Sequence, residues 1–253
     1  MSFIAIPASS VVPRYFKRNR GLATGFTVAG SSLGGIIWPI VFDQLLHHDS
    51  VSFAWSMRIA GFIMLPLCVV CVLVIRPPLK LQSPPEDTEK EIGSTTPGDG
   101  SKKTAKQKKD LSALRKPSFV LLCLGELVAV FGFFAPFFYI STYAVHLGFS
   151  SSLAFYLVSI INAASLFGRV LPGFVADRWG RFNMLVISAF SAGIIAFTWT
   201  KATSVAGLVV WALAYGFASG AILSMQIACA TTLADEESAG AAVGTVMGAT
   251  SLA

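Results

Sequence analysis

The sequence predicts an all-α protein that crosses a lipid bilayer several times. Of its 253 residues, 54% are hydrophobic and 13% are charged, about half the charged fraction of a typical soluble domain. Several stretches approach or exceed about 20 apolar residues, the length that a helix needs to cross about 30 Å of hydrocarbon. The net charge of +6 comes from basic residues between these stretches. Basic loops of this kind indicate membrane orientation, so we expect the lipid bilayer, and no nucleic acid, as a partner.

Six complete spans are expected, with a partial span at each end of the chain. The complete spans cover residues 21–46, 53–75, 118–146, 150–172, 182–200 and 204–234. Residues 1–12 and 240–253 are apolar but short, so we interpret them as the end of one further span and the start of another. The chain thus contains part of a helical half (1–76), a linker (77–117) and a second helical half (118–253).

The linker differs in composition from the rest of the chain. It is rich in Pro, Ser, Thr, Gly, Lys and Glu and has few large apolar residues, so it cannot bury enough surface to fold. Sixteen Lys and Arg residues lie in the linker and in the loops on its side of the membrane, against two on the other side. The positive-inside rule therefore predicts a cytoplasmic linker in a multi-pass membrane protein, for which we expect the plasma membrane as the location.

A polar stripe runs along the expected span 150–172. Ser159, Asn162, Ser165 and Arg169 fall within an arc of about 120° at 100° per residue, as on a face that lines a water-filled path. We therefore take all four as substrate-path candidates. A charge inside a span costs at least about 2.5–3.5 kcal/mol and usually faces a cavity or a partner. The alternative for Arg169 is that its long stem reaches the cytoplasmic headgroups.

Glu126 is the other ionisable residue expected deep within a span. Counted at about 1.5 Å per residue, it lies at a depth similar to that of Arg169 on the neighbouring span, so we predict that the two pair or alternate between pairing and substrate contact. The alternative is a packed, protonated carboxyl group. Tyr215 and Gln226 share one face of the last complete span and are further substrate-path candidates, while Gly216 lies roughly opposite and is available for helix packing.

Two pairs of glycines have the four-residue spacing that lets helices approach closely in a membrane, namely Gly21 with Gly25 and Gly30 with Gly34. We assign these four glycines to helix packing. The four cysteines lie inside apolar stretches without a nearby base, so we expect neither redox chemistry nor a metal site. No nucleophile–base pair, phosphate loop or cofactor motif is present in the sequence, and we expect neither an enzyme nor a bound cofactor.

The segment after the polar stripe carries a motif. Gly173-Phe-Val-Ala-Asp177-Arg178-Trp-Gly180-Arg181 is predicted to form a short loop between two spans and resembles the motif Gly-x-x-x-Asp-Arg/Lys-x-Gly-Arg of the major facilitator superfamily. The stretch from Tyr15 to Gly35 resembles the fungal branch of monocarboxylate-porter-like proteins. This resemblance implies a twelve-span fold, of which the chain would hold the end of the fourth span to the start of the eleventh.

The resemblance also implies function. Such proteins move small organic solutes by rocking two halves about a central site. The motif residues Gly173, Asp177, Arg178, Gly180 and Arg181 would form a cytoplasmic gate, with the Asp177 carboxylate accepting backbone N–H bonds from the start of the span at residues 21–24.

One position departs from the animal monocarboxylate porters. An aspartate one turn before their arginine takes part in proton coupling, and Ser165 occupies that position here, so the resemblance does not extend to proton-coupled symport. A small-molecule transporter is the predicted function. The alternative is a membrane protein that does not transport, either a regulator or an inactive fragment of a truncated gene product.

Overall fold

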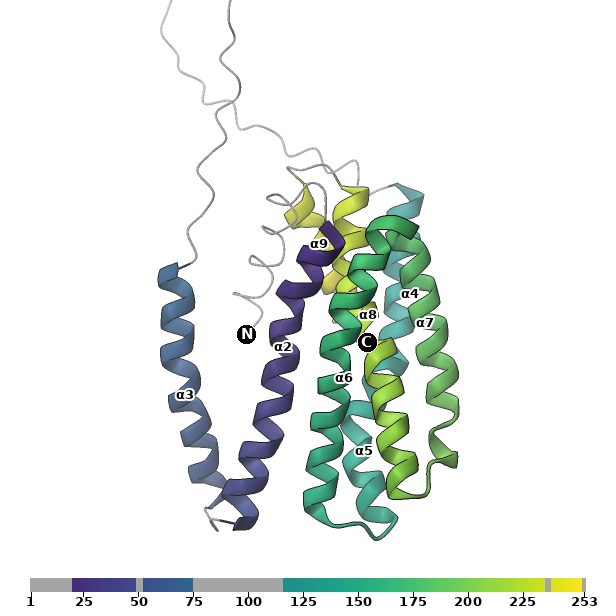
Figure 1. Cartoon of the computed structure of the whole chain (residues 1–253). Helices are drawn as coiled ribbons and strands as arrows, with labels where there is room; N and C mark the ends of the chain where they lie inside the picture. The colour runs from purple at the N-terminus through teal and green to yellow at the C-terminus, as the bar shows by residue number, and fades with distance from the viewer. Residues whose placement is uncertain (1–19, 49–51, 75–115, 235–237, 252–253) are drawn as a thin grey trace, which may run out of the picture.

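The computed structural model describes residues 20–48, 52–74, 116–234 and 238–251, and every regular element in these ranges is a helix (Figure 1). Six spans in these ranges are long and apolar enough to cross a membrane, which confirms the predicted number of complete spans. The helices are α2 (Arg20–Asp43), α3 (Phe53–Val74), α4 (Pro117–Phe133), α5 (Ala135–His146), α6 (Ser151–Trp179), α7 (Arg181–Phe197), α8 (Val205–Leu233) and α9 (Ala239–Thr250).

Two predicted segments lie outside the described residues, namely the partial span at 1–12 and nearly all of the linker at 77–117. The expected partial span near the other end of the chain corresponds to α9, an apolar helix too short to cross a bilayer. The predicted division of the chain into two helical parts and a linker stays a prediction.

Helix α6 lies at the centre of the described structure. It packs along α2 on one side and along α8 on another, and α7 packs mainly on α8 (Figure 1). The core takes side chains from every helix between α4 and α9, and Ala144, Ile161 and Ala212 within it are completely buried. In Figure 1 α3 stands apart from the bundle, joined to α2 through a π-helical turn (Gln44–His48), and most of its large apolar side chains are exposed.

The expected span 118–146 consists of two helices rather than one. Helix α4 ends at Phe133 and α5 begins at Ala135. Pro136 explains the break, because proline has no backbone N–H and its ring disfavours a continuous helix. The carbonyl group of Phe133 is satisfied from outside the helix, since the hydroxyl group of Tyr215 on α8 donates a hydrogen bond of 2.8 Å to it.

The prediction of a loop over residues 173–181 was wrong in extent. Helix α6 continues to Trp179, and Gly180 is the one non-helical residue between α6 and α7, which begins at Arg181. Gly180 has a φ of +96°, which glycine adopts at little cost and other residues rarely adopt. The residues between Gly173 and Trp179 favour no turn, so the helix persists through the charged part of the motif.

Aromatic rings stack in a column at the end of the bundle that contains His146, which we call the His146 end. Tyr143 meets Trp199 edge-on with ring centroids 5.5 Å apart, Trp199 stacks on Trp211 at 5.4 Å, and Trp211 stacks on Tyr215 at 4.9 Å. The indole N–H of Trp211 donates to the carbonyl oxygen of Ile195 at 2.8 Å. The column therefore links the turn between α7 and α8 to the break between α4 and α5.

Candidate functional site

The two parts of the chain that flank the linker meet along α2 and α6. The two helices run antiparallel, and polar groups connect them from Asp177 at one end to Ser159 near the other. We call this contact the α2–α6 seam and the end that contains Asp177 the Asp177 end. It is the candidate functional site because it contains most of the substrate-path and gate residues that the sequence predicts.

Asp177 closes one end of the seam. Its Oδ1 accepts a hydrogen bond from the backbone N–H of Gly21 at 2.9 Å, and its Oδ2 accepts one from Leu22 at 3.1 Å. These bonds confirm the predicted contact between Asp177 and the start of the span. The first N–H groups of a helix have no partner within the helix and carry its positive dipole end, so a carboxylate there is favourable.

Arg181 supports this contact from α7. Its guanidinium group lies 3.6 Å from Oδ1 of Asp177 and also donates a hydrogen bond of 2.6 Å to the hydroxyl oxygen of Thr232 on α8. Arg178 instead points over the ring of Phe174, 4.9 Å from its centroid. Of the two motif arginines, Arg181 therefore belongs to the Asp177 cluster and Arg178 lies outside it.

Arg169 contacts α2 deeper in the seam. One of its terminal nitrogens donates to the carbonyl oxygen of Val28 at 2.7 Å and to the hydroxyl group of Ser31. The side chain is only 5% exposed, and its Nε finds no acceptor among the residues that the structure describes. Arg169 is thus a buried cation held by backbone and hydroxyl oxygens, without a carboxylate partner in those ranges.

The other members of the polar stripe also meet α2. The hydroxyl groups of Ser165 and Ser32 are hydrogen-bonded at 2.8 Å, and the hydroxyl group of Ser159 donates to the carbonyl oxygen of Ile36 at 3.1 Å. Asn162 lies against Gly35, where an added methyl group would collide with its amide. The stripe therefore forms a continuous face toward α2, and its role in a substrate path stays a prediction.

Glycines determine how closely α2 and α6 approach, but only one of the two predicted pairs does so. A side chain on Gly21 would come within 2.6 Å of the carbonyl oxygen of Gly173, and one on Gly25 would collide with that of Arg169. Gly30 and Gly34 approach no other helix among the described residues, so their assignment to helix packing stays a prediction.

An added carbon on Gly30 would meet nothing within 4 Å in the described ranges, and one on Gly34 would meet only the side chain of Trp38 on its own helix. The reason is geometric. Nine residues separate Gly21 from Gly30, which is about 2.5 turns, so the second pair lies on the opposite face of α2.

The contact between α6 and α8 is equally close. Added side chains would collide with backbone carbonyl groups at Gly168, whose neighbour is Phe217, at Gly216, whose neighbour is Ile161, and at Gly220, whose neighbour is Ser165. This confirms the predicted packing role of the glycine face of α8. Ser165 thus lies between two helices, with its hydroxyl group toward α2 and its carbonyl group toward α8.

Glu126 does not pair with Arg169, contrary to one form of the pairing prediction. Arg169 turns toward α2, whereas Glu126 faces a cavity between α4, α7 and α8. The predicted depths of the two residues depend on helix rise alone, which carries no information about the direction in which each side chain points. Glu126 is nevertheless buried, with 3% of its surface exposed.

The two remaining candidates lie on α8. Tyr215 is buried, and its hydroxyl group bonds to the break in the span α4–α5 rather than to the seam. Gln226 is also buried, and its side-chain oxygen has no partner among the residues of the described helices. Neither residue joins the α2–α6 seam, and their place in a substrate path stays a prediction.

Sequence reasoning missed three residues of the site. Ser31 and Ser32 bind Arg169 and Ser165 from α2, and Thr232 binds Arg181 from α8. The adjacent serines were a usable signal, because Ser32 lies eleven residues, about three turns, after Gly21 and so shares its face. Within the described residues, no group of three or more His, Cys, Asp or Glu side chains could hold a metal ion.

Comparison with known proteins identifies the family. The model of the Major Facilitator Superfamily matches residues 1–253. The Agnestins efflux protein of Paecilomyces divaricatus is 45% identical over 247 residues, which cover 98% of this chain and 52% of that protein. An MFS-type transporter of Aspergillus fumigatus is 42% identical over 250 residues, covering 98% of this chain and 57% of that protein.

The Aspyridones efflux protein of Emericella nidulans is 37% identical over 225 residues, which cover 89% of this chain and 42% of that protein. The chain therefore spans about half the length of the curated relatives that it matches. The family match covers every span and the motif that closes the seam. The chain is a multi-pass membrane protein and belongs to the Major Facilitator Superfamily.

Proposed function

We propose that the protein transports a small organic solute across the membrane by alternating access, with the α2–α6 seam as the contact that opens and closes between its two halves. The observation that carries the proposal is the pair of hydrogen bonds from Gly21 and Leu22 to the carboxylate of Asp177. These bonds connect helices that flank the linker. They involve only three residues at one end, so they can be broken without disturbing the packing within either half.

Arg169 supports an acidic solute as the cargo. A buried guanidinium group with an unsatisfied Nε and no carboxylate partner in the described part of the chain can receive the carboxylate of a solute when the seam opens. A monocarboxylate-like compound or a related metabolite would meet this requirement. The proposal gives position 165 no part in proton coupling, because Ser165 offers a hydroxyl group that is bonded to Ser32.

Two relatives bear names that describe them as efflux proteins, for agnestins and for aspyridones. We therefore propose export from the cell, across the plasma membrane, as the direction and place of transport. On this proposal the Asp177 end of the seam lies in the cytoplasm, as the distribution of Lys and Arg predicts.

Chemical labelling of a buried position tests the gate. Ser165 is 1% exposed within the closed seam, so a cysteine placed there, in a chain whose native cysteines are replaced by alanine, should react slowly with N-ethylmaleimide. Asp177→Asn removes the charge from two hydrogen bonds, each worth about 1.5–3 kcal/mol when charged, and should raise the labelling rate about tenfold or more. The rate is measured as the mass shift over time.

Lys201→Gln is the matched control, because Lys201 is exposed at the opposite end of the bundle and changing it should leave the rate unaltered. An unchanged labelling rate in Asp177→Asn would reject the gate. Transport itself is tested in yeast that lacks its own exporters, using a longer chain that contains this sequence and a panel of aromatic acids. Equal retention of every acid with and without the protein would favour the non-transporting alternative.

A further inference from the structure

Two buried side chains inside the bundle have oxygen atoms that no hydrogen bond satisfies. Glu126 on α4 and Gln226 on α8 are each 3% exposed, and within the described ranges neither Oε2 of Glu126 nor Oε1 of Gln226 has a partner. Buried polar groups usually have hydrogen-bond partners, so two such acceptors require an explanation. Both atoms are enclosed by the helices described above, so a further span packed on the outside of the bundle would reach neither.

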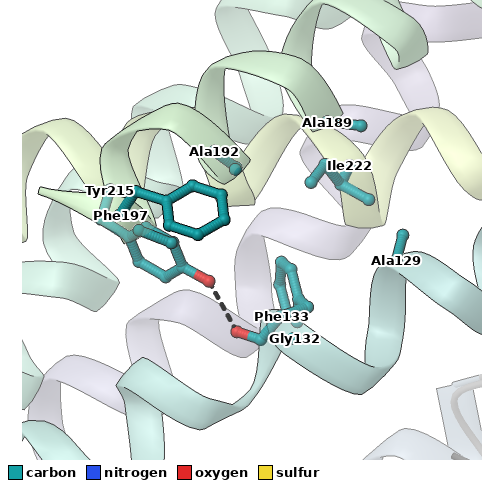
Figure 2. A pocket seen from close by; sticks show the side chains of 10 residues that line it. Ala129, Gly132, Phe133, Ala189, Ala192, Phe197, Tyr215 and Ile222 are labelled. Carbon is teal, nitrogen blue, oxygen red and sulfur yellow. Dashed lines mark hydrogen bonds between the residues drawn. The ribbon is translucent and has the colours of Figure 1, made fainter. Parts of the chain in front are cut away.

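Helix α8 turns one narrow face toward α4. Tyr215 on this face donates to the carbonyl oxygen of Phe133, the last residue of α4, and Figure 2 shows this bond with Ile222 farther along α8. Ile222 lines the same cavity as Glu126. The thiol group of Cys229 lies within electrostatic range of the Glu126 carboxyl group. The two helices therefore run in opposite directions, since later residues of α8 meet earlier residues of α4.

Gln226 belongs to this face of α8. At about 100° per residue, its position lies about 40° from Ile222 and about 60° from Cys229 around the helix axis. Both of these neighbours lie close to Glu126. The side chain of Gln226 therefore leaves α8 on the side of Glu126.

Glu126 and Gln226 also point toward each other along the bundle. Glu126 lies seven residues, about 10 Å, before the end of α4, and Gln226 lies eleven residues, about 17 Å, beyond Tyr215, which meets that end. Helix side chains lean toward the N-terminus of their own helix. Because α4 and α8 are antiparallel, Glu126 leans toward the Asp177 end and Gln226 toward the His146 end. The two side chains thereby close the remaining difference of about 6 Å.

One proton satisfies both oxygen atoms. A carboxylate only accepts hydrogen bonds, whereas a protonated carboxyl group also carries an O–H donor. With the proton on Oε2, Glu126 can donate to Oε1 of Gln226, and no charge stays buried. A carboxylate in the same place would leave both acceptors unsatisfied.

Arg181 connects this pair with the Asp177 cluster. The thiol group of Cys229 lies within electrostatic range of Arg181 as well as of Glu126. Thr232, which accepts a hydrogen bond from Arg181, is three residues farther along α8. The guanidinium group of Arg181 lies 3.6 Å from Asp177, which is not a close contact. An ionised Glu126 would therefore compete with Asp177 for this cation.

Other ionisable groups around Glu126 are few in the described ranges. Helix α9 contains none, and α7 contributes only Arg181. Lys116 precedes α4 and lies about 15 Å from Glu126 along the helix. None of the remaining groups is a permanent cation. On α4, α5 and α8 they are Cys123, Tyr139, Tyr143, His146, Tyr215 and Cys229.

We propose that Glu126 and Gln226 form a proton-binding site that controls the Asp177 end of the seam. With the proton bound, Glu126 donates to Gln226, and Arg181 stays with Asp177. When the proton passes to water on the cytoplasmic side, the carboxylate attracts Arg181, and the contact of Asp177 with α2 weakens. This inference rests on the proposed function of the seam as a gate.

Infrared spectroscopy of the chain in lipid nanodiscs tests the proton. A protonated carboxyl group has a C=O stretching band that a carboxylate lacks, so the difference spectrum between the unaltered chain and Glu126→Gln should contain one such band. Gln226→Leu should move this band to higher frequency, because the carboxyl group loses its hydrogen bond. Asp177→Asn is the matched control and should remove a carboxylate band instead, since Asp177 accepts bonds from two backbone N–H groups.

A difference spectrum without a protonated-carboxyl band would overturn the proposal. This result includes the case in which the amide group of Gln226 turns its N–H toward an ionised Glu126.

The labelling of Ser165→Cys tests the link to the gate. At each pH, the rate in the chain with Glu126 is divided by the rate with Glu126→Gln, which imitates the protonated form. This division removes the pH dependence of the thiol reaction itself. The ratio should stay near one at acidic pH and rise at least about fivefold as the pH increases and Glu126 loses its proton, which is the lower end of the usual coupling between two sites.

Two arginine variants show whether the link runs through Arg181. Arg181→Gln, introduced with and without Glu126→Gln, should hold the ratio near one at every pH. Arg178→Gln is the matched control and should preserve the rise, because Arg178 lies over the ring of Phe174 and outside the Asp177 cluster.

A ratio that stays near one at every pH while Arg181 is present would overturn the proposal, even with the infrared band observed. Failure of the gate itself looks different, because Asp177→Asn would then leave the labelling rate unchanged. In that case the infrared band, which does not depend on labelling, would still support the proton site, but its control of the seam would be overturned.

Discussion

Glycine has opposite consequences in two regions of this molecule. At Gly25, Gly168 and Gly220, along the contacts of α6 with α2 and α8, an added side chain would run into a backbone carbonyl group. At Gly132 on α4 and Gly193 on α7, it would meet nothing within 4 Å in the described structure. The same residue type therefore closes helices together in one region and leaves room between them in the other. The two regions are distinguished by what lies next to each glycine in the structure, because the spacing of glycines in the sequence is not enough.

The largest expected effect comes from a bulky side chain in the closed region. Gly168→Leu would force α6 away from the backbone of α8 at Phe217, and overpacking of this kind should destabilise the protein by about 3 kcal/mol or more. Gly132→Leu, the matched variant on a face of α4 where an added carbon meets nothing within 4 Å among the described residues, should not destabilise the protein, because Leu favours a helix more than Gly does. Thermal unfolding in detergent, followed by size-exclusion chromatography, measures both. If both variants lost the same stability, the two regions would not differ in how tightly their helices pack.

A smaller change tests the same contrast within one helix. Gly25→Ala places a methyl group against the backbone of Arg169 and should cost about 1–3 kcal/mol, whereas Gly30→Ala on the opposite face of α2 should be close to neutral. The same unfolding assay applies. If Gly30→Ala proved the more harmful of the two, the orientation of α2 in the seam would be wrong.

The break between α4 and α5 offers a third comparison. Tyr215→Phe keeps the aromatic stack but leaves the carbonyl group of Phe133 without its donor, at a cost of about 1–2 kcal/mol. Tyr139→Phe, on the exposed side of α5, is the control and should have no measurable effect. Chemical denaturation in mixed micelles gives the two values. Equal midpoints for the two variants would mean that the bond does not stabilise the break.

The weakest effect concerns the serine pair of the seam. A double-mutant cycle of Ser32→Ala and Ser165→Ala should give a coupling energy of about 0.6 kcal/mol, the average for hydrogen bonds between membrane helices. Stability measured for the two single variants and the double variant supplies the cycle. If the loss of stability in the double variant equals the sum of the losses in the single variants, the two hydroxyl groups contribute to stability independently, although they are adjacent.

The sequence was sufficient for features that depend on composition and on position along a helix. Hydrophobic length predicted the six spans, and the charged motif predicted that Asp177 would bind the first amides of the span at residues 21–24, where the structure places Gly21 and Leu22. Span length is a quantity that a single helix possesses by itself, whereas the partner of Asp177 was implied by the resemblance to a family. Pairing between helices is different, because it depends on how each helix is rotated about its axis.

Each error can be traced to that rotation or to a local backbone choice. Glu126 and Arg169 share a depth along their helices, but their side chains point in different directions. The loop expected after Gly173 is helical because a single glycine, Gly180, is enough to turn the chain. The rotation of a helix about its axis depends on the helices that pack against it. A single sequence does not show which helices these are.

The stacked rings at the His146 end have an optical consequence. The indoles of Trp199 and Trp211 lie 5.4 Å apart and only 19° from parallel, with Tyr215 continuing the stack. Chromophores this close share their excited states, so their near-ultraviolet circular dichroism depends on their mutual orientation. The protein thus carries an intrinsic spectroscopic reporter of the broken span, distant from Asp177 and readable without an added label.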